Sequence, residues 1–281
     1  MIIVAILKHV AGKSADYGAA LDYLKYEHDE VLKKPLLDAN GNWVLRRDIL
    51  LEGINCEPEL FDVECEMLNA QYHKNQNYDE IKTHHYLISF DPADKDECGL
   101  TGEQAQAIGM EYVKANFPGH QALVCTHMDG HNGSGNIHVH IVINSLRKLD
   151  VPQQPFMERP IDCKAGYKHH LTKDYLKHLQ QSLMNICMRE SLNQVNLLSP
   201  SVNKITQQEY YAKQRGQINL DMLNTELIAE GFTPMKTKFQ TEKDKLRDAI
   251  TAAAKKAESF EEFSRLLQTE SNILVKDHRG R

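Results

Sequence analysis

The residues best suited to chemistry are three histidines whose spacing could bring them to one point: His127, His138 and His140. Because side chains alternate across a strand, His138 and His140 share one face of any strand that contains both. The segment up to Asn136 is rich in glycine, asparagine and serine, as hairpin loops are, so an antiparallel return puts His127 beside the other two. Three imidazoles around open positions are typical of a catalytic metal site.

Two residues of the loop could assist these ligands. Asp129 follows His127 by two residues and could accept a hydrogen bond from its imidazole, as carboxylates behind metal ligands do, although an aspartate also suits a turn. His131 is a weaker candidate ligand. Imidazole ligands do not by themselves select among zinc, copper, iron and nickel. A divalent ion here could bind a phosphate oxygen and stabilise charge in the transition state, and the reaction then needs a nucleophile.

A candidate nucleophile comes from an expected helix over residues 14–30, with Ser14 as its N-cap. This helix carries Tyr17, Tyr23 and Tyr26, and a phenol can form covalent intermediates once it loses its proton. Tyrosines on an amphipathic helix also serve simply as core residues, so the pattern alone leaves the choice among them open.

The pattern along the chain predicts the elements that must position these groups. We expect strands near residues 2–10, 84–90, 120–126 and 137–144, and helices over 58–73, 101–116 and 172–189. An Asn-Gly turn at residues 40–41 predicts a small hairpin. The fold class is α+β, a central antiparallel sheet flanked by helices. We expect one domain over residues 1–199, which holds these groups, and a mostly helical extension over 200–281 that starts a longer C-terminal region.

Composition narrows the class of protein. The 281 residues are 41% hydrophobic and 26% charged, and no run of about 18 apolar residues predicts a membrane span. The six cysteines form no C-x-x-C pair, so we expect reduced thiols and a cytoplasmic location. A net charge of −6 is unlike that of most nucleic-acid-binding proteins, so binding would depend on local basic patches such as Arg147-Lys148.

These residues resemble the motifs of one enzyme family. The pattern His127-Met-Asp129, then Asn136-Ile-His138-Val-His140-Ile-Val-Ile-Asn144, resembles the third motif of MOBP-type conjugative relaxases, which are mobilisation nucleases of the His-hydrophobic-His endonuclease group. The helix around Tyr23 resembles their first motif, and His85-Tyr-Leu-Ile-Ser89-Phe-Asp-Pro92 their second. The resemblance covers about residues 1–195 and is greatest to relaxases of Gram-positive conjugative transposons.

The resemblance implies a role for each residue. Tyr23 would attack a phosphodiester at an origin of transfer and leave a 5′-phosphotyrosine and a 3′-OH, and reversal would rejoin the strand. The three histidines would hold Mg²⁺ or Mn²⁺, with Asp129 orienting His127. Ser89 would contact DNA near the cleaved phosphate, and we expect weaker DNA contacts from three further residues: Asn144, Arg147 and Lys148.

The resemblance also implies partners. These are single-stranded and hairpin DNA at the origin of transfer, an accessory DNA-binding protein and the coupling protein of a type IV secretion system. The protein would act in the cytoplasm and travel with the DNA into a recipient cell, without membrane insertion.

Four other functions remain open at this point. A metal-dependent nuclease could use activated water, with Tyr23 only structural, and a replication initiator of the same superfamily would share the chemistry. An accessory DNA-binding protein with a vestigial site would keep the fold alone. A nucleotide hydrolase of the histidine-triad kind is disfavoured because Val142 stands where its third histidine belongs.

Overall fold

The structure is a computed structural model that describes residues 5–14, 16–29, 34–128, 136–199 and 207–276. The chain divides into two compact units, Met1–Pro200 and Ser201–Arg281. Each unit is described by itself below.

The N-terminal unit is built on a five-stranded sheet in the order β1-β5-β7-β6-β4, and every neighbouring pair is antiparallel. The strands are β1 (Ile6–Gly12), β4 (Ile49–Ile54), β5 (Thr83–Ser89), β6 (His120–His127) and β7 (His138–Arg147). A separate two-stranded sheet pairs β2 (His28–Asp29) with β3 (Lys34–Pro35). The expected antiparallel α+β fold is confirmed, and β4 is a strand that the sequence pattern did not predict.

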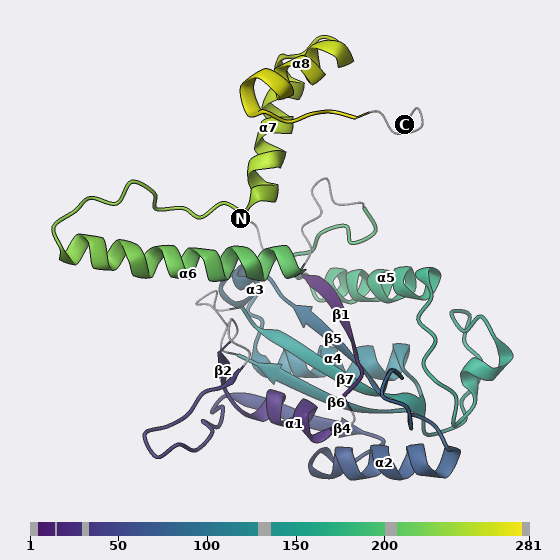
Figure 1. The fold of residues 1–281 in the computed structure, drawn as a ribbon. Coiled ribbons are helices and arrows are strands. Elements are labelled where there is room, and N and C mark those ends of the chain that lie inside the picture. The colour runs from purple at the N-terminus through teal and green to yellow at the C-terminus, as the bar shows by residue number, and fades with distance from the viewer. Residues whose placement is uncertain (1–4, 15, 30–33, 129–135, 200–206, 277–281) are drawn as a thin grey trace. The chain divides into compact units, whose positions relative to one another are not determined.

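Helices cover both faces of this sheet (Figure 1). On one face, α4 (Gly102–Asn116) and α5 (Lys173–Arg189) pack against alternate residues of β7, Val139 and Ile141, in the larger core. On the other face, α1 (Gly18–Lys25) and α2 (Phe61–Tyr72) cover Cys125 and Val142. Short helical turns complete the unit: η1 (Pro58–Leu60), α3 (Pro92–Glu97) and η3 (Pro160–Cys163). The alternation of β7 therefore decides which of its side chains enter which layer.

The tyrosine helix is much shorter than expected. The prediction of a helix over residues 14–30 with Ser14 as its cap is wrong, because α1 runs only from Gly18 to Lys25. The Asp16 carboxylate accepts from the backbone N–H of Ala19 at 3.0 Å and so satisfies one of the donors at the helix start. At the other end Tyr26 is extended, and Glu27 N–H donates to the carbonyl of Val44. Pairing with this distant segment ends the helix.

The predicted Asn-Gly turn is confirmed, because Leu37 and Trp43 form an antiparallel bridge around it. Gly41 adopts a φ of 83°, a left-handed conformation that glycine reaches without strain. The Asp38 carboxylate accepts from the backbone N–H groups of Asn40 and Asn42 and closes the turn.

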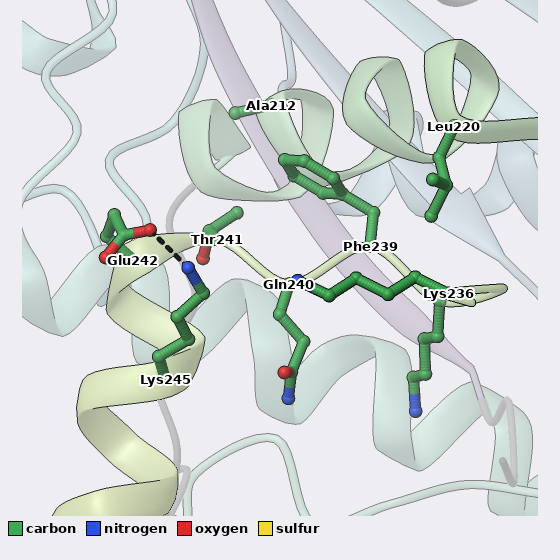
Figure 2. Close-up of a pocket in the computed structure, with 9 residues that line it drawn as sticks. Ala212, Leu220, Lys236, Phe239, Gln240, Thr241, Glu242 and Lys245 are labelled. Carbon is green, nitrogen blue, oxygen red and sulfur yellow. Dashed lines mark hydrogen bonds and ion pairs between the residues drawn. The ribbon is translucent and has the colours of Figure 1, made fainter. Parts of the chain in front are cut away.

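The C-terminal unit is helical, with α6 (Gln207–Ala229), α7 (Glu242–Lys256) and α8 (Phe260–Ser271). Figure 2 shows a pocket in this unit where Phe239 reaches toward α6. A Cβ at Gly216 would lie 2.2 Å from the Phe239 ring, so the glycine makes room for it. None of the nine residues that line this pocket is a predicted site residue. No helix in the described ranges has the length and hydropathy needed to cross a bilayer.

Candidate metal centre and active site

The predicted histidine hairpin is present. Strands β6 and β7 pair antiparallel with His127 directly opposite His138 and Cys125 opposite His140, so all three histidines share one sheet face. Ligand atoms of the three imidazoles lie within 4.8 Å of one another, and all three side chains are buried. They are the one set of three such ligand atoms that the described part of the chain brings together.

Two of the ligand rings are oriented by backbone carbonyls. His127 donates its Nε2–H to the carbonyl of Leu24 at 2.9 Å, and His138 donates its Nδ1–H to the carbonyl of Asn136 at 3.3 Å. A carbonyl can only accept, so each contact fixes which ring nitrogen carries the proton. The other nitrogen of each ring, Nδ1 of His127 and Nε2 of His138, is then the one that would face a metal. Metal-binding histidines are commonly oriented in this way.

The third ligand ring meets another histidine. His140 Nδ1 lies 2.8 Å from Nε2 of His85, a partly buried residue of β5. Burial, with lesser effects from Lys8 and His9, lowers the pKa of His85 to about 4, so its imidazole is neutral near pH 7.

The donor set fits a divalent metal. Three imidazoles that converge on one point supply three nitrogen ligands and leave coordination positions for substrate, the arrangement of catalytic sites. The site therefore suits Lewis-acid chemistry on an oxygen of the substrate.

Tyr23 is the tyrosine that the fold brings to this site. Its ring centroid lies 5.6 Å from that of His140, 6.0 Å from that of His85 and 5.2 Å from that of His28. Its helix is also joined to the metal site, because Leu24, the next residue, accepts the hydrogen bond from His127. The candidate nucleophile and a candidate metal ligand are thus held by one turn of α1.

The other two tyrosines of this segment lie elsewhere. Tyr26 packs its ring edge-on against Trp43, with centroids 5.4 Å apart. Tyr17 is buried and its hydroxyl accepts from Asn69 Nδ2 at 2.6 Å, while burial raises the pKa of Tyr17 to about 12. Tyr17 is therefore a buried core residue of the N-terminal unit.

The other predicted site residues fall into three groups. Ser89 lies directly opposite His138 on β5, and its Oγ accepts from Asn136 Nδ2, so it adjoins the metal ligands. Asp129 and His131 both lie outside the described residues. The structure does not bring the remaining three into the site. Asn144 and Arg147 are buried further along β7, and Lys148 binds the Glu64 carboxylate at 2.8 Å.

Sequence reasoning missed His85 as a member of the site, although a signal for it was present. Side chains alternate along β5, so His85 and Ser89 share a face, and Ser89 was already a predicted site residue. The sequence could not predict that the carbonyl of Leu24 orients His127, because every residue type has a backbone carbonyl.

Four other histidines gather on the opposite sheet face, around Tyr86: His9, His84, His120 and His169. His9 Nε2 lies 2.9 Å from His84 Nδ1, and Tyr86 Oη lies 2.8 Å from His169 Nε2. Burial lowers the pKa of His84 and of His120 to about 3, with smaller contributions from nearby positive groups, and lowers the pKa of His169 well below its usual value.

This second histidine group predicts a loss of stability in acid. Because the folded-state pKa values lie below about 6.5, the unfolded chain binds protons first as the pH falls. The free energy of unfolding should therefore be largest above pH 6.5 and fall toward pH 3, by about 1.4 kcal/mol per pH unit for each histidine. Urea unfolding followed by the fluorescence of Trp43, the single tryptophan, at pH 7.5 and pH 5.5 measures this difference. His84→Gln should reduce the difference, and equal stability at the two pH values would contradict the prediction.

Part of this chain, including the three histidines, is similar to a family of known proteins. Residues 43–152 match the family described as relaxase, MobA/VirD2-like, nuclease domain. This part of the chain is therefore similar to a relaxase nuclease domain. The matched segment contains Ser89 and all three histidines of the candidate metal centre. It begins at residue 43, after Tyr23, so the candidate nucleophile is not part of that match.

Curated proteins with similar sequences carry one common name. Two proteins of Staphylococcus aureus, each named protein rlx, are 26% identical to this chain, over 235 and 176 residues. The alignments cover 84% and 63% of this chain and 59% and 44% of those proteins, so the chain spans about half the length of the curated relatives it matches. A solved structure of the conjugative relaxase TrwC in complex with mutant OriT DNA is 12% identical, covers 95% of this chain and 99% of that one, and has a TM-score of 0.37. At that TM-score the two structures share too little for a comparison residue by residue.

Proposed function

We propose that this relaxase domain cuts one strand of DNA at an origin of transfer and rejoins it through a covalent link to Tyr23, which starts conjugative transfer. The observation that carries the proposal is the position of the Tyr23 ring, 5.6 Å from that of His140 in the three-histidine site. A nucleophile beside a site that can bind phosphate is what such a transesterification needs.

The residues of the chain have distinct roles in this reaction. The phenolic oxygen of Tyr23 forms a bond to phosphorus, the bond from phosphorus to the 3′ oxygen breaks, and the products are a 5′-phosphotyrosine and a 3′-OH. The phenolic proton must pass to a base, and the imidazole of His28, with its ring 5.2 Å from that of Tyr23, adjoins the nucleophile. Reversal by the 3′-OH rejoins the strand without an external energy source.

We propose Mg²⁺ or Mn²⁺ as the ion held by His127, His138 and His140. When bound, the ion would supply charge stabilisation at a non-bridging phosphate oxygen. An all-nitrogen ligand set favours later transition metals by softness, so Mn²⁺ is the better match of the two and the better probe. We propose that Asp129 helps to orient His127 by sharing its Nε2–H with the carbonyl of Leu24.

Exposed residues of β1, at the edge of the sheet face that holds the site, support binding of single-stranded DNA. Ile6 and Val10 lie on the same face as Ser89 and the metal ligands, and both are more than two-fifths exposed. Lys8 stands between them on that face, so apolar surface for bases and a cation for phosphate adjoin the site. We propose hairpin DNA, an accessory DNA-binding protein and a secretion coupling protein as the other partners in conjugation.

Formation of a covalent adduct tests the proposed function. The protein is incubated with a labelled single-stranded oligonucleotide spanning an origin of transfer from its own element and with Mn²⁺, then resolved on a denaturing gel. We expect a labelled band at the size of the protein plus the 5′-linked DNA fragment. Cleavage without any adduct would favour a nuclease that uses activated water. If folded, metal-loaded protein gives neither adduct nor cleaved DNA, the relaxase function and the nuclease function are both refuted.

A further inference from the structure

The three metal ligands differ in how their second ring nitrogen is held. His127 and His138 contact backbone carbonyls, whereas His140 contacts the side chain of His85. Strands β5 and β7 are neighbours, with Leu87 opposite His140 and His85 opposite Val142. His85 is therefore the diagonal neighbour of His140 on the same face, within reach of a large side chain.

Metal binding by His140 determines which nitrogen of each of these two rings carries a proton. If His140 binds the ion through Nε2, its Nδ1 carries the proton and donates it to Nε2 of His85 over the observed 2.8 Å. His85 must then accept at Nε2 and hold its own proton at Nδ1. A carboxylate or a carbonyl usually fills this accepting role behind a metal-bound histidine.

His85 also adjoins the nucleophile. Its ring centroid lies 5.0 Å from that of His140 and 6.0 Å from that of Tyr23, while the Tyr23 ring meets His140 edge-on. The three rings are in mutual contact, so the position of His85 affects a metal ligand and the nucleophile together.

We propose that His85 is a positioning residue that holds His140 in the tautomer and orientation needed to bind the metal. The inference rests on the proposed metal-dependent function of the same site. His85 acts through His140, so a substitution of His85 should weaken the affinity for the metal even in the absence of DNA.

A matched pair of substitutions tests the role of the acceptor. Glutamine and methionine have similar shape, but glutamine offers a carbonyl oxygen near the place of Nε2 and methionine only a weak sulfur acceptor. Titration calorimetry with Mn²⁺, without DNA, should give His85→Met a dissociation constant about 10-fold to 100-fold weaker than that of the unsubstituted protein. His85→Gln should stay within about 3-fold of the unsubstituted protein, because it restores the acceptor.

The neighbouring histidine provides the control. His84→Gln changes the same strand, but His84 faces the other side of the sheet, where it contacts His9, so Mn²⁺ affinity should not change. Thermal melts without metal establish that each variant is folded. Equal affinity of folded His85→Met and unsubstituted protein would overturn the inference, and so would a His85→Gln protein as weak as His85→Met. In either case the proposed function would stand as long as the unsubstituted protein binds Mn²⁺. If the unsubstituted protein binds no Mn²⁺, the role of His85 and the proposed metal-dependent function are both refuted.

Discussion

Tyr23→Phe should abolish the covalent adduct with origin DNA while the protein stays folded and still binds Mn²⁺. The phenylalanine keeps the ring against His28, His85 and His140 and removes only the oxygen that would attack phosphorus. Loss of the attacking group of a covalent catalyst lowers the rate by roughly 10³-fold or more. Adduct formation over time, measured on denaturing gels at saturating Mn²⁺, gives the two rates.

Tyr26→Phe is the matched control, because Tyr26 is three residues away but its ring packs on Trp43. This variant should form adduct at close to the unsubstituted rate. The opposite result, with adduct lost in Tyr26→Phe and kept in Tyr23→Phe, would move the nucleophile to Tyr26. Normal cleavage without adduct in Tyr23→Phe would instead point to an activated water molecule.

His138→Ala should remove both metal binding and cleavage. His138 lies between His127 on β6 and Ser89 on β5, so its loss leaves two imidazoles and an incomplete ligand set. Metal contributes several kcal/mol to such a transition state, which corresponds to a fall in rate of roughly a thousandfold. Adduct formation across a Mn²⁺ series, with EDTA-treated unsubstituted protein alongside, measures the loss.

A thermal melt separates loss of the ligand from loss of the fold. An ion at about 100 times its dissociation constant stabilises the folded state by about 2.7 kcal/mol, which should raise the Tm of the unsubstituted protein by roughly 5–10 °C. His138→Ala should melt close to the metal-free unsubstituted protein and show no such rise. A rise of normal size in this variant would show that His138 is not a ligand.

The convergence of the three histidines was predictable from sequence because strand geometry determines it. A repeat of two residues places His138 and His140 on one face, and a loop rich in glycine and asparagine returns His127 to them. The pairing of β6 with β7 confirms both steps. The start of α4 after Thr101 was also predictable. Thr101 and Gln104 form a capping box, and the sequence shows the two residue types at the spacing that this motif requires.

Other features depend on contacts between distant segments and were not predictable. The length of α1 is set by pairing of Glu27 with Val44, a contact that no local propensity encodes. The choice of Tyr23 over Tyr26 depends on where that helix ends, because the extended backbone at Tyr26 turns its ring toward Trp43. Buried Asn144 and Arg147 were expected at the DNA, yet their residue types alone could not distinguish a polar core position from an exposed one.

The hydrogen bond from His127 to the carbonyl of Leu24 has a thermodynamic consequence. The last turn of α1 helps to hold a ligand ring, so a bound ion must help to hold that turn, by the reciprocity of linked equilibria. Affinity for the ion and protection of the α1 amides from hydrogen exchange are then two measurements of one coupling free energy. A bound cation would therefore also determine how much of the time Tyr23, the proposed nucleophile, is in place.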